Sequence, residues 1–72
     1  MEQLRDQIRR LKWGIYRLSV NRDEHASKAT LEIRAGRSGS LAHRTEEYYA
    51  ELNDRFVRDL KRLLADSQSR LA

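Results

Sequence analysis

The chain has 72 residues, of which 36% are charged and 39% hydrophobic, and its formal net charge is +4. A chain of this length forms at most one small domain with a shallow core. It contains no cysteine, which excludes disulfides and thiolate metal sites and fits a reducing compartment. The first residues lack the apolar core of a signal peptide, and no apolar run approaches a membrane span. We therefore expect a cytoplasmic protein.

The positive charge is concentrated in the first third of the chain. Residues 1–22 contain six Arg or Lys and two acids, a net charge of +4, whereas residues 45–72 contain five bases and six acids, a net charge of −1. This balance of charged and apolar residues is typical of long, exposed helices and not of a disordered tail. The basic segment predicts an anionic partner, either an acidic protein surface or nucleic acid, with a membrane surface the least favoured.

A turn is predicted at the midpoint, in Gly36-Arg37-Ser38-Gly39-Ser40. Glycine adopts the positive φ angles that end a helix, and serine accepts hydrogen bonds from the first amides of the next helix. The sequence therefore predicts an all-α fold: a helix over 2–35, a turn over 36–40 and a helix over 41–68. Together they form one antiparallel helical hairpin over residues 1–72.

The first predicted helix carries an apolar stripe in which spacings of four and three residues alternate: Leu4, Ile8, Leu11, Ile15 and Leu18. Such spacing is typical of a coiled-coil seam. The stripe is expected to continue, smaller and partly polar, through Arg22, Ala26, Ala29 and Ile33. A helix break near Asn21 is an alternative, because residues 21–23 could cap a new helix. Residues 30–35 also alternate as a strand would, but they have no second strand to pair with, and helix is favoured.

The second predicted helix has a much wider apolar arc, formed by Leu41, Tyr48, Tyr49, Leu52, Phe56, Val57, Leu60, Leu63 and Leu64. Folding the chain about the turn gives a register in which the numbers of facing residues sum to about 75. This register pairs Ile8 with Ser67, Leu11 with Leu64, Ile15 with Leu60, and Leu18 with Val57 and Phe56. It then pairs Ala26 and Ala29 with Tyr48, Tyr49 and Thr45, and Ile33 with Leu41 and Ala42. Because a rod two helices thick has a thin core, we expect it to dimerise into a four-helix bundle.

A second stripe lies opposite the Leu/Ile seam of the first helix. Trp13, Tyr16 and Val20 follow one another at helical spacing, and Arg5, Arg9 and Lys12 lie on or beside the same face. One interpretation is that Trp13 packs inside an oligomer. The other is a basic-aromatic face that binds a different molecule, since Trp, Tyr and Arg are enriched among interface hot spots.

No catalytic, metal-binding or cofactor-binding constellation is predicted. His25 and His43 are the only histidines, and in the predicted register they do not face each other, which argues against a shared metal or a base–nucleophile pair. The turn with Arg34, Arg37 and Arg44 could hold a phosphate at a helix start. It lacks the Gly-Lys-Ser/Thr ending of a nucleotide-binding loop, and helix capping explains the same residues.

These observations predict a small non-enzymatic interaction protein: an adaptor, inhibitor or regulator without a cofactor. It would bind a larger protein with an acidic or mixed surface, and the predicted partner-binding residues are Arg5, Arg9, Lys12, Trp13, Tyr16 and Val20. One alternative is a nucleic-acid-binding regulator that uses the same arginines, and another is a structural subunit of a larger assembly. Protein binding is preferred because eleven acids are spread along the chain and no known nucleic-acid-binding motif is present.

Overall fold

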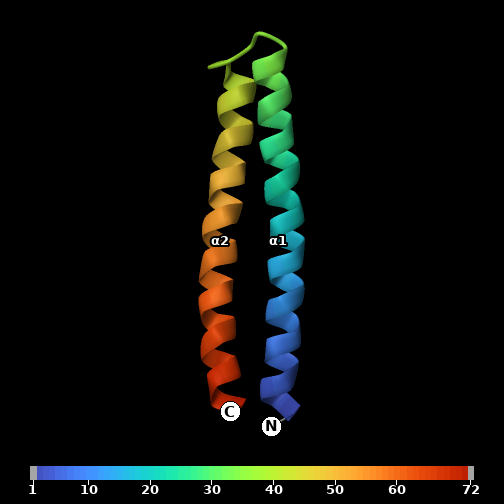
Figure 1. Cartoon of the computed structure of the whole chain (residues 1–72), viewed down its shortest axis with the longest axis vertical. Helices are drawn as coiled ribbons and strands as arrows, with labels where there is room; N and C mark the ends of the chain where they lie inside the picture. The colour runs from blue at the N-terminus through green and yellow to red at the C-terminus, as the bar shows by residue number, and fades with distance from the viewer. Residues whose placement is uncertain (1, 72) are drawn as a thin grey trace.

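The computed structural model describes residues 2–71 as two long helices packed side by side (Figure 1). Helix α1 spans Glu2–Arg34 and helix α2 spans Leu41–Leu71. They form a rod that measures 53 × 14 × 14 Å between Cα atoms. The turn closes one end of the rod, and the free ends of both helices lie at the other (Figure 1). The predicted all-α antiparallel hairpin is confirmed.

Helix α1 continues without a break through Asn21 and through residues 30–34. Both local alternatives, a new helix capped near Asn21 and a strand before the turn, are therefore wrong. Helix α1 ends at Arg34, so Ala35 already belongs to the turn. Helix α2 extends beyond Gln68, where the sequence suggested that it ends, to Leu71. The helical pairing thus runs along nearly the whole length of the rod.

The end of α1 forms two hydrogen bonds that stop the helix. The amide of Gly36 donates to the carbonyl of Ile33 at 3.0 Å, and the amide of Arg37 donates to the carbonyl of Glu32 at 2.9 Å. This pair of bonds is the Schellman motif, which requires a left-handed residue after the helix. Gly36 supplies it with a φ of 79°.

The start of α2 is built by the second half of the same turn. The amide of Ser40 donates to the carbonyl of Arg37 at 3.0 Å, and Gly39 occupies the third position of this turn with a φ of 80°. The Ser40 hydroxyl then accepts a hydrogen bond from the amide of His43 at 3.1 Å. In return, Nδ1 of His43 accepts a hydrogen bond from the amide of Gly39 at 2.9 Å. Serine and histidine together cap the helix in a variant of the capping box, in which the second side chain reaches the amide of Gly39, the residue before the N-cap, and not that of the N-cap itself.

Toward the free ends of the helices, the seam is apolar and follows the predicted register. Val57 is 1% exposed, and Ile8 and Ser67, which were expected to face each other, are both buried. Phe56, which was expected to face Leu18 together with Val57, is instead 48% exposed, because the seam selects only Val57 of the two. A Cβ placed on Gly14 would lie 3.4 Å from Cδ1 of Leu60, which places these two residues at the same level. The small hydroxyl side chain of Ser67 leaves room for Ile8 at the end of the rod.

Toward the turn, the seam of α1 differs from the prediction. Ala26 and Ile33, which were expected to extend the stripe, are exposed, and Ile33 is 50% exposed. The reason is that spacings of four and three residues continue to alternate after Leu18, as a coiled-coil seam requires. That alternation selects Arg22, His25, Ala29 and Glu32, which are buried or half-buried.

The seam of α2 behaves in the same way. Its half-buried seam positions near the turn are His43, Glu46, Ala50 and Asn53, and the neighbouring Leu52 and Asp54 are also half-buried. Tyr48 and Tyr49, expected to cover Ala29, are instead 60% and 45% exposed, and Leu41, expected to face Ile33, is 75% exposed. The expected packing of large against small apolar residues at the turn is therefore wrong. In this half, the seam is largely polar, and the tyrosines and Leu41 lie mostly outside it.

Leu60→Ala should destabilise the hairpin by about 2 kcal/mol, the lower end for a leucine truncated in a core, because Leu60 is only partly buried. Thermal unfolding followed by circular dichroism measures the change. The matched control is Leu41→Ala, which removes the same atoms from a side chain that is 75% exposed. Equal losses from the two substitutions would contradict the seam described above.

Gly14→Ala should stabilise the protein by up to about 1 kcal/mol, the difference in helix propensity between the two residues. The added Cβ would meet Leu60 at 3.4 Å, an ordinary van der Waals contact.

Gly36→Ala should instead destabilise the protein by about 1–2 kcal/mol, because Gly36 has a positive φ, which alanine adopts only with strain. Urea unfolding measures the change in unfolding free energy for each variant. If Gly14→Ala destabilises the protein, the close approach of the helices requires that residue 14 has no side chain.

Candidate functional site

The outer face of α1 carries an exposed aromatic pair. Trp13 and Tyr16 are each 60% exposed, and Val20, one turn further along, is 39% exposed. The two rings are stacked, with centroids 5.7 Å apart and planes inclined by 21°. This places the three predicted residues on the side of α1 that faces away from α2. Their apolar surface is not used by the hairpin itself.

The predicted basic residues flank this aromatic pair near the free end of α1. Arg5, Arg9 and Lys12 are all exposed. Arg9 approaches Asp6, with 3.6 Å between Nη1 and Oδ1, and both side chains are well hydrated. A pair of this kind contributes little to stability. The arginine side chains therefore remain available to a partner, while Asp6 makes the face mixed in charge and not uniformly basic.

A polar network lies between the helices in the half of the rod near the turn. Arg22 donates to Asp23 of its own helix and to Asp54 of α2, each at 3.1 Å, and Arg58 binds the second oxygen of Asp54 at 3.0 Å. Both hydrogen bonds raise the pKa of Arg22, and the bond to Asp23 has the larger effect. One turn toward the tip, the ring of His25 hydrogen-bonds Glu46 across the seam. These contacts join the helices where apolar burial is sparse.

The two histidines do not form a shared site. His25 binds Glu46 and lies 5.3 Å, between ring centroids, from Tyr49. His43 binds the turn through Nδ1 and Glu47 through Nε2, at 3.2 Å. Within residues 2–71, no group of three or more His, Cys, Asp or Glu side chains is arranged to hold a metal ion.

Arg37 of the turn does not form a phosphate cradle with the helix start. The guanidinium of Arg37 binds both carboxylate oxygens of Glu32, and these hydrogen bonds lower the pKa of Glu32. The amides of Gly39 and His43, which could face an anion, are already bonded to side chains of the cap. Arg37 and the cap therefore stabilise the turn itself.

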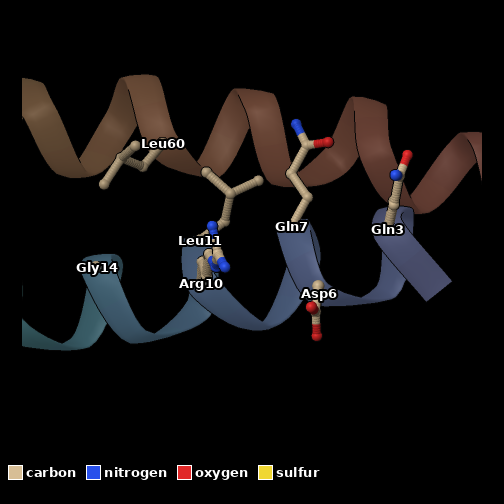
Figure 2. A pocket seen from close by; sticks show the side chains of 7 residues that line it. All are labelled: Gln3, Asp6, Gln7, Arg10, Leu11, Gly14 and Leu60. Carbon is tan, nitrogen blue, oxygen red and sulfur yellow. The ribbon is translucent and has the colours of Figure 1, made fainter.

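A shallow groove of about 500 Å³ lies beside the seam near the free end of α1. In Figure 2, Leu11 and Gln7 point from α1 toward α2, whereas Asp6 points away on the far side of the helix. Gly14 and Leu60 close the groove toward the middle of the rod. The missing side chain of Gly14 is one reason that the surface is hollow here.

A third surface was not singled out by the sequence analysis. Tyr49, Phe56 and Leu63 of α2 are 45%, 48% and 51% exposed. They are seven residues apart, so they share one line along a coiled-coil helix. We call these three residues the α2 apolar row. The wide apolar arc of α2 was recognised from the sequence, but only the position of the seam shows which of its members remain outside.

Comparison of the chain with family models, with curated proteins and with solved structures finds no match. Over residues 2–71, neither helix is long and apolar enough to cross a membrane.

Proposed function

We propose that this chain is a small non-enzymatic interaction protein of the cytoplasm, an adaptor, inhibitor or regulator, that binds a larger protein through the outer face of α1. The observation that carries the proposal is the stacked pair of Trp13 and Tyr16, each 60% exposed on the side away from α2. Exposed apolar patches ringed by charge mark contact sites. Trp and Tyr in particular dominate the binding energy of protein interfaces.

The charges around the pair support a protein partner with acidic or mixed character. Arg5, Arg9 and Lys12 attract an acidic surface, while Asp6 next to Arg9 offers an acceptor to a basic group. A nucleic-acid ligand would gain from the bases alone and would be repelled by Asp6 and Glu2. Protein binding therefore makes fuller use of the face.

Self-association is the second part of the proposal. Helix α2 leaves Tyr49, Phe56 and Leu63 about half exposed, although the rod is only 14 Å thick. Burial of such surface contributes about 25 cal/mol per Å². We therefore propose that the hairpin forms a homodimer, a four-helix bundle in which apolar side chains of α2 are covered.

Trp13→Ala combined with Tyr16→Ala should abolish capture of the partner from the native cell and, with the purified partner, should weaken binding by about 2 kcal/mol or more, the usual size of a hot-spot loss. Helicity and melting temperature should change little. The matched control is Tyr48→Ala, an aromatic residue with the same 60% exposure on α2, which should bind normally. If the double substitution instead lowers the melting temperature or dissociates a dimer, this face is core and the proposal fails.

Arg5→Glu with Lys12→Glu adds a test of the partner class, and Arg9 is left in place because it already contacts Asp6. Binding to a protein should become slower and less dependent on salt. A steep linear fall of log K with log salt for the unmodified chain would instead indicate phosphate neutralisation and a nucleic-acid ligand.

Sedimentation at micromolar concentration should give a mass near twice 8.5 kDa. The melting temperature should rise with protein concentration, because association stabilises the folded state by mass action. A folded monomer whose melting temperature is independent of concentration would contradict self-association.

A further inference from the structure

The side of the rod that carries the α2 apolar row can be identified from contacts between the helices. Gly14 approaches Leu60, and the ring of His25 lies 5.3 Å from that of Tyr49. The ion pair between Arg22 and Asp54 links the helices on the opposite side. Residues at positions 7, 14, 21 and 28 of α1 therefore lie beside the α2 apolar row, and together they form one long side of the rod.

This side is poor in charge at the positions that border the seam. Its α1 positions are Gln7, Gly14, Asn21 and Lys28, and its α2 positions are Ala42, Tyr49, Phe56, Leu63 and Arg70. Only Lys28 and Arg70 are charged, and each lies toward an end. The opposite side, by contrast, holds the network of Arg22, Asp54 and Arg58. Depletion of charge with retention of aromatic residues characterises the centre of protein interfaces.

The α2 apolar row is centred on the helix. Helix α2 spans Leu41–Leu71, so Phe56 is the middle residue of the helix. A two-fold axis through Phe56, perpendicular to the rod, would bring Phe56 against its own copy and Tyr49 against Leu63 of the second copy. The same axis would overlap two rods along their whole length, with the turn of each beside the free ends of the other. Homodimers commonly use such self-complementary patches.

We infer that this side of the rod binds a second copy of the chain in antiparallel orientation, about a two-fold axis at Phe56. The inference rests on the self-association proposed above and specifies its interface and geometry. This side runs the full length of the rod, which measures 53 Å between Cα atoms, so two antiparallel copies would be in contact along both helices.

The α1 half of the interface is complementary under the same axis. Residue 56 faces residue 19 within each hairpin in the observed register, so the axis crosses α1 near Ser19. Leu31 then lies opposite Gln7 of the second copy, in the groove that Leu11, Gly14 and Leu60 line. Leu31 is 60% exposed in the single hairpin. It shares one line along α1 with Gln3 and Arg10, which border the groove, because these positions are separated by multiples of seven.

The charges at the rim partly match in this arrangement. Glu24 of each copy would lie opposite residue 14 of the other, between Arg10 and Arg17, which are exposed on the same line of α1. An acid flanked by two bases favours this orientation and register, whereas Lys28 lies at the level of Arg10 of the second copy and opposes it. The arrangement also places the polar half of each seam beside the apolar half of the other hairpin. The outer face with Trp13 stays outside the bundle, so the dimer exposes two such faces, one from each copy.

The test uses single cysteines, which are unambiguous because the chain contains none. Phe56→Cys should form a disulfide-linked dimer under mild oxidation, since a residue on a two-fold axis lies next to its own copy. Tyr49→Cys mixed with Leu63→Cys should give the heterodimer in preference to either self-linked dimer. The matched control is Trp13→Cys, which replaces an exposed aromatic residue on the outer face and should link no faster than random collision.

Sedimentation of the unmodified chain, run in parallel, separates failure of this interface from failure of self-association. A dimer of the unmodified chain in which Phe56→Cys fails to link, or in which Trp13→Cys links faster, overturns this interface and leaves self-association standing. Self-linking of Tyr49→Cys and of Leu63→Cys in preference to the mixed pair overturns the antiparallel orientation. A monomer overturns both proposals.

A second measurement does not depend on cysteine chemistry. Phe56→Glu should raise the dissociation constant of the dimer at least tenfold while each hairpin remains helical, because Phe56 is already 48% exposed in the single hairpin. Trp13→Glu, again the matched control, should leave the dissociation constant unchanged. An unaltered dimer of Phe56→Glu would overturn the interface.

Discussion

A pair of helices can bury only one stripe of each helix, and this constraint governs the whole molecule. The stripe follows alternating spacings of three and four residues from Leu4 to Glu32 and from His43 to Ser67. The chain contains more apolar residues than two such stripes can accommodate. The surplus, which includes Trp13, Tyr16 and Phe56, stays at the surface. Both proposed binding surfaces therefore follow from the geometry of packing two helices.

The seam changes its chemistry halfway along the rod. In the half between Leu4 and Leu18 of α1, burial of aliphatic side chains from both helices holds the seam together. The most buried of these side chains is Val57 of α2. Beyond Leu18 the seam is held by Arg22 with Asp54 and by His25 with Glu46. Partly exposed ion pairs contribute less than apolar burial because water competes for both partners. The turn half is thus the less stable half, and an antiparallel second copy would place apolar residues beside it.

Apolar surface on two sides of the rod allows two binding events without competition. The side with the α2 apolar row is poor in charge and fits a copy of the same chain. The outer face of α1 combines stacked aromatic rings with bases and an acid, which suits a different protein. Trp13 and Gly14 are successive residues, so they point roughly 100° apart around the axis of α1. The centres of the two surfaces are therefore separate, with Arg10 and Arg17 at the border between them, and one hairpin can offer both. A dimer would then present two equivalent outer faces, which increases avidity for a partner that is itself multivalent.

By itself, the sequence determined the turn, the helix lengths to within a few residues, the apolar half of the seam and the outward direction of Trp13 and Tyr16. These features depend on local backbone chemistry, as at Gly36 and Ser40, or on a strong repeat of large apolar residues. Only the tertiary structure decided the phase of the seam after Leu18. Hydrophobicity favours Ala26 and Ile33, each one residue away from the positions that α1 turns inward. Of the inward positions, His25 pairs with Glu46 of the other helix, whereas Glu32 binds Arg37 only five residues further along the chain. Both positions follow the unbroken coiled-coil spacing of the packed pair.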